Sequence, residues 1–318
     1  MLYYWNIMPR IIRGFAYVFT RFMRISGAES LAAASNIFVG IESALTIRPY
    51  LNDMTRSELC TILTAGMATV ASNVLAIYVF SLQSQFPTIA GHLISASILS
   101  APAALIMSKL LLPETESPKT LGEHVQVHYE KERSLFDAIM NGANTGVKLI
   151  VGIAALLIAI LGLVALLDLV LGGVGSKLNA LLGMHIDWTL KGLLGYVGLP
   201  FALIMGVPPA DALEIGRLIG ERVVLTEVVS YQDLAVMLQQ GVLQHPRSAM
   251  IATYALCGFA HVSSMAIFVG GVAALAPARS HDLGQVALRA LFAATLATFM
   301  TACVAGTFYS SGMVPVGQ

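Results

Sequence analysis

Three ionisable residues lie inside otherwise apolar segments of the chain, namely Glu42, Glu227 and His261. A charged side chain at membrane depth is costly, so such residues generally face a partner or a water-filled path. Apolar neighbours on both sides of Glu227 favour a functional role. The alternative for His261 is a packing role, in which its ring donates a hydrogen bond to a carbonyl of a neighbouring helix. Glu42 has an alternative as a helix cap, because a carboxylate complements the helix dipole.

Two neutral residues with oxygen-bearing side chains, Asn36 and Thr69, lie where apolar segments are interrupted. Sodium is a hard cation that prefers oxygen ligands, as other hard cations do. One amide, one hydroxyl and unwound backbone carbonyls would be enough to bind it. Spacing alone does not separate this sodium site from ordinary helix–helix hydrogen bonding.

The elements that position these residues are predicted to span a membrane. Of 318 residues, 57% are apolar and 11% are charged, and the net charge is zero. The zero net charge argues against a nucleic-acid partner, for which an excess of basic residues would be expected. Stretches without Asp, Glu, Lys or Arg cover Leu59–Ser108, Leu149–Leu167, Ser248–Ala278 and Ala290–Gln318. Since about 20 apolar residues cross a bilayer, the first stretch holds two spans and the others one each.

The order of these segments suggests two related halves. The predicted elements are a hairpin (30–51) and spans (59–80 and 89–112) in one half, and a hairpin (192–212), a short segment (217–236) and a span (249–277) in the other. A polar loop follows Pro113, and a further span covers 148–171. Both hairpins are short apolar segments with Gly or polar breaks, and we expect them to be re-entrant. Such a pair indicates a secondary transporter with inverted repeats. The fold class is therefore all-α integral membrane.

Several motifs occur together along nearly the whole chain. They are Ser35–Gly40 (SNIFVG), Ile47–Tyr50 (IRPY), Gly66–Ala71 (GMATVA), Ser95–Pro102 (SASILSAP), Pro113–Glu116 (PETE) and Leu256–Ala260 (LCGFA). In this order and spacing the sequence resembles the concentrative nucleoside transporters. The resemblance implies a sodium:nucleoside symporter with broken helices, no organic cofactor and an elevator-like transport domain.

The resemblance also implies roles for individual residues. The sodium ligands would be Asn36, Val39, Thr69 and Val70, with the two valines contributing carbonyls. The nucleoside would be held by Val74, Glu227, Phe259 and Ser264, with His261 where the family has Asn. At the hairpin tip, Ile41, Glu42 and Ser43 stand where the family has Gln, Thr and Glu. A site that loses a hydrogen-bonding partner discriminates strongly against its old ligand, so we expect an altered base preference.

The resemblance divides the chain into five parts. They are an interfacial helix (1–28), a first repeat (29–112), a polar loop with an interfacial helix (113–146), a scaffold span (147–175), and a second repeat with a C-terminal span (176–318). Residues 1–24 carry four arginines among apolar residues, as interfacial helices do. The family's first three spans have no counterpart here, so we expect either that the given chain is part of a longer one or that a separate polypeptide completes the scaffold. The resemblance also implies a homotrimer, located in the plasma membrane and specifically in a bacterial inner membrane.

Two other functions remain open from the sequence. The carrier could be proton-coupled, or specific for another small polar solute, because Glu42 and His261 are titratable. A nucleoside-binding membrane gate without transport is the second alternative. An enzyme is not expected, because HExxH and GxSxG motifs are absent and Glu227 has no nucleophile beside it.

Overall fold

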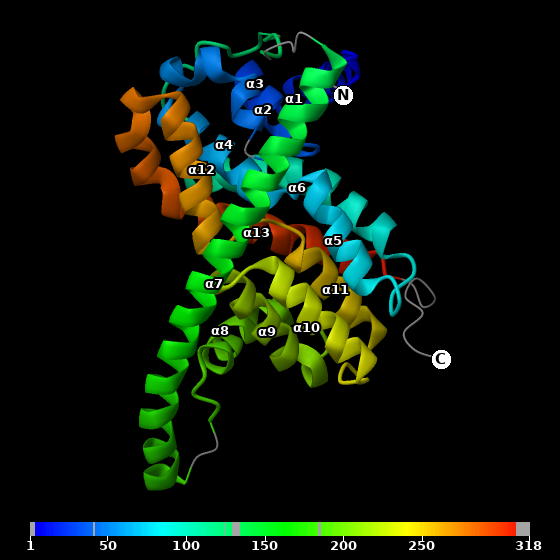
Figure 1. Ribbon diagram of the computed structural model, residues 1–318, viewed down its shortest axis with the longest axis vertical. Helices are drawn as coiled ribbons and strands as arrows, with labels where there is room; N and C mark the ends of the chain where they lie inside the picture. Colours follow the sequence, from blue (N-terminus) through cyan, green and yellow to red (C-terminus); the bar gives the residue numbers. More distant parts are fainter. Residues whose placement is uncertain (1–3, 41, 124, 129–133, 184–185, 310–318) are drawn as a thin grey trace. The chain divides into compact units, whose positions relative to one another are not determined.

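The computed structural model describes residues 4–40, 42–123, 125–128, 134–183 and 186–309. Its regular structure is helical (Figure 1), with one isolated antiparallel bridge between Ser26 and Leu121. The helices are α1 (Ile7–Met23), α2 (Gly27–Asn36), α3 (Ser43–Thr46), η1 (Arg48–Asp53), α4 (Arg56–Ala68), α5 (Ser72–Leu82), α6 (Ile89–Leu111), α7 (Leu135–Leu182), α8 (Leu190–Ile204), α9 (Pro209–Val224), α10 (Glu227–Gln239), α11 (Pro246–Leu256), α12 (Val262–Leu275), η2 (Pro277–Arg279) and α13 (Ser280–Thr307).

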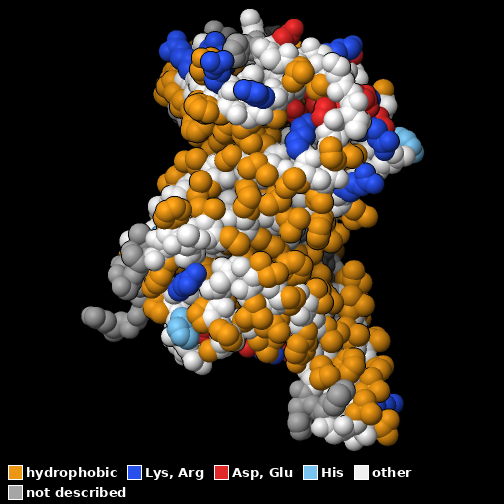
Figure 2. Space-filling model, turned by 180° about the vertical axis from the view of Figure 1, so that it is seen from behind, with side chains coloured by type: hydrophobic (Ala, Val, Ile, Leu, Met, Phe, Trp, Pro, Cys, Tyr) orange, Lys and Arg blue, Asp and Glu red, His pale blue; other side chains and the backbone are white. Residues whose placement is uncertain are grey.

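Three helical stretches are long and apolar enough to cross a membrane: Ile89–Leu111, Leu161–Leu182 and Pro277–Thr307. The first confirms the predicted span at 89–112. The second belongs to α7, which exposes many leucines, including Leu163, Leu166 and Leu169. Hydrophobic side chains also cover much of the face drawn in Figure 2. Exposed apolar surface on this scale indicates a membrane or protein-partner environment.

The chain forms two compact units. The first contains residues 1–73, 97–154 and 264–297, and the second contains 74–96, 155–263 and 298–318. Each unit is assembled from segments that are far apart in sequence. The five-part division and the inverted repeats inferred from the sequence stay predictions.

Within the first unit, α2 and α4 begin in the same way. Ser26 and Glu29 form a capping box at the start of α2, and Thr55 and Glu58 form another at the start of α4. Each box satisfies backbone donors that the first helical turn leaves free. Lys109 joins the two helix starts, since its Nζ lies 2.6 Å from Glu29 Oε1 and 2.9 Å from Ser57 Oγ. The carboxyl ends of α2 and α4 carry Asn36 and Thr69.

Within the second unit, α8 and α9 pack through glycines. A Cβ at Gly198 would lie 2.2 Å from the Gly216 carbonyl oxygen, and one at Gly220 would lie 2.5 Å from Leu194 Cβ. Small residues allow two backbones to approach this closely. The segment 192–212 was expected to be interrupted at its glycines and prolines, namely Gly195, Gly198, Pro200, Gly206, Pro208 and Pro209. The first three are wrong as breaks, because α8 runs without interruption to Ile204. The chain does turn at 205–208, which contains Gly206 and Pro208.

Asp211 fixes the start of α11 against α9. Its carboxylate accepts hydrogen bonds from the Gln244 and His245 backbone N–H groups at 2.8 and 3.0 Å, and from Ser248 Oγ at 2.6 Å. These donors include the N–H groups and hydroxyl just before and within the first turn of α11. Asp211 therefore acts as a long-range cap for that helix.

The span predicted at 59–80 is two helices, α4 and α5, separated at 69–71, which is the interruption expected at Thr69. Two other expected elements differ in the structure. The span predicted at 249–277 is two helices, α11 and α12, separated at 257–261. The surface helix expected after the polar loop is the beginning of α7, which continues to Leu182 as one helix. The breaks at 69–71 and 257–261 both carry residues of the candidate site.

Candidate functional site

Glu227 is a buried carboxylate at the first position of α10, with 0% of the residue exposed. The partial positive charge of a helix N-terminus favours a carboxylate there. Glu227 Oε1 accepts a hydrogen bond from Tyr78 Oη at 2.5 Å. Its other oxygen, Oε2, lies 3.3 Å from His261 Nε2. Tyr78 and His261, which come from distant parts of the sequence, therefore each lie next to one oxygen of the Glu227 carboxylate.

His261 lies in the break before α12 and is 1% exposed. The edge of its ring contacts Phe259, with centroids 4.7 Å apart and an interplanar angle of 79°. Phe259 and His261 both lie in this non-helical segment, with Ala260 between them. The predicted contributions of Glu227, Phe259 and His261 are thus brought together in the second unit.

Two buried tyrosines support this cluster. The rings of Tyr78 and Tyr231 stack with centroids 4.5 Å apart and an interplanar angle of 26°. Tyr231 Oη donates to the Thr253 carbonyl at 2.7 Å. Stacking fixes the Tyr78 ring, and the hydrogen bond fixes the ring beneath it. Tyr78 is therefore held in the orientation in which its hydroxyl reaches Glu227.

Arg222 is a fully buried guanidinium in α9 and interacts electrostatically with Glu227. Its Nη1 donates to the Ala255 carbonyl at 2.5 Å and to Thr298 Oγ1 at 3.0 Å. Its Nε and Nη2 have no hydrogen-bond partner among the described residues. A buried charge is costly unless an opposite charge compensates it, so we expect the buried Arg222 and Glu227 to stabilise one another.

Asn36 ends α2 in the first unit and is 1% exposed. Its Oδ1 accepts from Ser43 Oγ at 2.7 Å, while Nδ2 has no partner among the described residues. Amide oxygen and nitrogen are exchangeable assignments in such a network. Exchanging them lets Nδ2 donate to Ser43 and directs the oxygen into the unfilled position. Asn36 is therefore suited to present an oxygen to a cation.

Thr69 is the residue at which α4 ends, and its backbone is extended (φ −103°, ψ 165°). Its hydroxyl donates to the Ala65 carbonyl at 2.8 Å, so lone pairs of the oxygen remain available. The break between α4 and α5 lies beside the hairpin tip, since a Cβ at Gly40 would be 3.4 Å from Ala71 Cβ. Helix carboxyl ends expose carbonyls and carry partial negative charge. These features suit a small cation near Asn36, Val39, Thr69 and Val70.

The remaining predicted site residues are Ile41, Glu42, Ser43, Val74 and Ser264. Ile41 lies outside the described residues. Glu42 is half-buried at the N-cap of α3, but its side chain makes no capping hydrogen bond. Val74 is half-buried near the start of α5, and Ser264 is fully buried in α12. Ser43 bonds to Asn36, which ties the predicted base-reading tip to the predicted sodium ligand.

Sequence reasoning missed Tyr78, Tyr231 and Arg222. A signal for the tyrosines was present in the similar endings of Val74–Tyr78 and Glu227–Tyr231. Arg222 follows Glu221 in a segment with several charged residues, which is typical of a solvated helix face. Its distance of five residues from Glu227, within an apolar run, was the available indication.

Comparisons with known proteins identify the family of the chain. The family described as "Na+ dependent nucleoside transporter C-terminus" matches residues 92–306, and one described as "Nucleoside recognition" matches residues 1–85. Solute carrier family 28 member 3 of Mus musculus is 40% identical over 320 residues, covering 96% of this chain. The uncharacterized transporter YutK of Bacillus subtilis is 38% identical over 310 residues, covering 97% of this chain and 74% of YutK.

The solved structure of CNTnw in an inward-facing substrate-bound state is also similar. It has a TM-score of 0.83 and 35% sequence identity, and the match covers 97% of this chain and 72% of that one. The chain spans 44% of the length of the mouse relative. A family match over most of the chain, with relatives of this identity and a shared fold, leads to one conclusion: the chain belongs to the Na+-dependent nucleoside transporter family.

Proposed function

We propose that the chain is the transport core of a sodium:nucleoside symporter. The observation that carries this proposal is the buried Tyr78–Glu227–His261 cluster. A carboxylate that is removed from water and held by two polar groups is a strong acceptor for the hydroxyls of a sugar. The family to which the chain belongs is named for Na+-dependent nucleoside transport.

In this proposal, Glu227 accepts the ribose hydroxyls and Phe259 packs against the nucleoside. His261 and Ser264 contribute further hydrogen bonds, and Val74 contributes apolar contact. Ile41, Glu42 and Ser43 supply the face that reads the base. The direct bond between Ser43 and Asn36 supports a coupling between ligands, since a cation that orders Asn36 also orders the tip. Each ligand would then raise the affinity for the other.

Sodium binds in the proposal at Asn36, Val39, Thr69 and Val70. The unpartnered amide of Asn36 and the free carboxyl end of α4 support this placement. No organic cofactor is required, because binding energy and the sodium gradient drive the cycle. Catalytic residues are likewise not part of the scheme.

Transport would follow an elevator-type alternating-access cycle with re-entrant hairpins and inverted repeats. CNTnw has been solved in an inward-facing substrate-bound state, and a doubly substituted form has been solved in an outward-facing state with a TM-score of 0.88 to this chain. We place the protein in the plasma membrane, specifically a bacterial inner membrane, as a homotrimer. A separate scaffold polypeptide is a further partner in this proposal.

Proton coupling is the second candidate, and the Glu227–His261 pair favours it. Imidazole is the side chain that most readily changes charge near neutral pH. A proton at this buried pair would change the charge of the nucleoside site directly. Tyr78, Arg222, Tyr231 and Cys257 are buried groups that interact electrostatically with Glu227.

A thermal-shift screen followed by uptake measurements tests the two candidates. The chain in detergent is heated with nucleosides and bases, in sodium or in choline. Preferential binding to the folded state raises the melting temperature. We expect a nucleoside to stabilise the protein only in sodium, and proteoliposomes to accumulate it down a sodium gradient. Uptake that follows a pH gradient and ignores sodium selects proton coupling. Proteoliposomes that take up no nucleoside under either gradient contradict both.

A further inference from the structure

The helix α1 presents three distinct faces along its length. Pro9, Ile12 and Phe19 are buried, whereas Ile7, Ile11, Val18 and Phe22 are exposed. A helical residue advances by 100°, so these exposed residues, spaced by four, seven and four, share one stripe. This is the apolar stripe. A basic stripe beside it consists of Arg10, Arg13, Arg21 and Arg24, spaced by three, eight and three.

The basic stripe has no acidic counterpart nearby in sequence, since the first acidic residue of the chain is Glu29. Glu29 is itself buried against Lys109. Among the described residues, none of the four arginines forms an ion pair. Arg13 Nε bonds only to the Pro9 carbonyl of its own helix. Four guanidinium groups therefore remain available to an anion from outside the protein.

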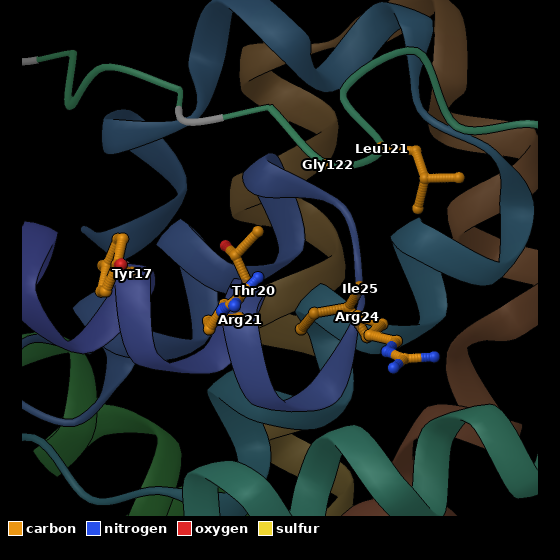
Figure 3. Close-up of a pocket in the computed structure, with 7 residues that line it drawn as sticks. All are labelled: Tyr17, Thr20, Arg21, Arg24, Ile25, Leu121 and Gly122. Atoms are coloured by element: carbon orange, nitrogen blue, oxygen red, sulfur yellow. The ribbon is translucent and has the colours of Figure 1, made fainter.

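A cavity of about 510 Å³ lies at the carboxyl end of this stripe (Figure 3). It is lined by Tyr17, Thr20, Arg21, Arg24, Ile25, Leu121 and Gly122. A second cavity of about 230 Å³ shares Tyr17 and Thr20 and is lined by both Arg13 and Glu123, so the uncompensated basic groups gather at the larger cavity. The volume of the larger cavity falls within the range typical of sites for small molecules.

The backbone around the larger cavity is held in place on both sides. Arg24 has a left-handed backbone (φ 52°), which turns the chain sharply after α1. The opposite side is the loop at 118–123, which is anchored by the Ser26–Leu121 bridge and by the Gly27 N–H bond to the Thr120 carbonyl at 2.8 Å. Figure 3 shows Arg21 on the last turn of α1 and Arg24 just after that helix, with Leu121 and Gly122 on this loop.

We propose that this basic cavity binds the phosphate headgroup of an anionic phospholipid whose acyl chains lie along the apolar stripe of α1. Guanidinium groups bind phosphate oxygens in a bidentate geometry. The adjacent apolar stripe selects a lipid over a soluble anion, because the two stripes together match an amphipathic ligand. An interfacial helix with arginines beside exposed apolar residues is the usual form of such contacts.

Lipid binding to the purified full chain tests the proposal. Binding of dioleoylphosphatidylglycerol and dioleoylphosphatidylcholine is measured by native mass spectrometry and by thermal shift. We expect the wild-type chain to prefer the anionic lipid. The variant Arg21→Gln/Arg24→Gln should bind that lipid roughly 25-fold more weakly, since each basic residue near a membrane surface contributes about fivefold. Its binding of phosphatidylcholine should be unchanged.

Matched variants separate the cavity from general charge. Lys177→Gln/Arg289→Gln removes two exposed cations elsewhere and should bind the anionic lipid as the wild type does. Arg21→Lys/Arg24→Lys keeps the charge and should lose only a few-fold, through loss of the bidentate geometry. Val18→Ser/Phe22→Ser keeps all arginines and should weaken lipid binding while leaving the buried face of α1 intact.

Three results would overturn the proposal. One is equal affinity for the two lipids, and another is an equal loss in the control variant. The third is full competition by millimolar inorganic phosphate, which would identify a site for a soluble anion. None of these measurements depends on nucleoside transport, so their outcome is independent of the proposed function.

Discussion

The rings of Tyr78 and Tyr231 stack at 4.5 Å, although 152 positions separate the two residues in the sequence. Tyr78 reaches Glu227, whereas Tyr231 lies one turn after Glu227 in α10 and bonds to the Thr253 carbonyl. The stack therefore links α5 to the helix that carries the buried acid. Variants that keep the stack therefore separate the packing that supports Tyr78 from the hydrogen bond that Tyr78 donates to Glu227.

Replacing the two tyrosines one at a time distinguishes their roles. Tyr78→Phe keeps the stack and removes the hydrogen bond to Glu227, so we expect about tenfold weaker nucleoside binding. Tyr231→Phe is the matched control, since it also keeps the stack and loses one buried hydrogen bond. It should lower the melting temperature similarly but leave nucleoside affinity nearly unchanged. Equal losses of affinity in the two variants would contradict the assignment of Tyr78 to the site.

Glu227→Gln tests the acid itself. The amide keeps the shape of the side chain but loses the charge that strengthens hydrogen bonds to hydroxyls. We expect nucleoside affinity to fall about 10- to 100-fold, which corresponds to roughly 1.5–3 kcal/mol for a hydrogen bond to a charged group. Isothermal titration with nucleosides in sodium measures this loss. Glu214→Gln, in α9 and paired with Arg217, is the control and should bind normally.

Arg222 and Glu227 form a second test because their charges compensate one another. Arg222→Met removes the buried cation and leaves the carboxylate uncompensated, so we expect a loss of about 3–5 kcal/mol in unfolding free energy. Arg217→Met in the same helix is the control. Arg217 is partly exposed and pairs with Glu214, so its removal should cost under about 1 kcal/mol.

The double variant Arg222→Met/Glu227→Gln completes this test. It removes both charges together, and we expect it to be more stable than Arg222→Met alone. Chemical unfolding measurements of the four proteins give the coupling energy. Strictly additive losses would show that the two buried charges do not stabilise one another.

The sodium residues are tested most sharply at Thr69. Thr69→Ala removes a proposed ligand oxygen, and we expect at least tenfold more sodium to be needed for half-maximal nucleoside binding. Thr64→Ala is matched, because Thr64 lies in the same helix and its hydroxyl also donates to the carbonyl four residues earlier. It should leave the sodium requirement unchanged. A sodium titration of the nucleoside-induced thermal shift measures both, and identical curves for the variants would exclude Thr69 as a ligand.

Much of this architecture was predictable because glycine and polar residues interrupt apolar runs. The segment at 89–112 was identified correctly from its length and lack of charge. Glycine was not a helix breaker in α8, where Gly198 allows the backbone of α9 to approach and the helix continues. Local sequence does not show which of these two uses a glycine has.

The sites were predictable to the extent that single residues are unusual in their context. Glu227 and His261 stand out as ionisable residues in apolar segments, and the structure brings them together. Arg222 was missed because its neighbours are also charged, and only tertiary packing reveals that it is buried. The break at 257–261 was missed as well, since its residues before His261 are apolar apart from Gly258, and a single glycine does not predict an interruption.

We expect Asp211 to contribute to the loss of folding stability at acidic pH. Burial raises the pKa of this carboxyl, but hydrogen bonds from Ser248, Gln244 and His245 outweigh that effect and hold the pKa below its ordinary value. A lowered pKa in the folded state means that the stabilisation is complete above the ordinary pKa of aspartate. It is lost as the pH falls through the lower value of the folded protein. Asp211→Asn should cost about 1–3 kcal/mol near neutral pH and less in acid. Melting curves between pH 6 and pH 3 measure this, with the exposed Asp53→Asn as control. A constant difference between wild type and Asp211→Asn across that range would contradict the linkage, because the cap would then act without its charge.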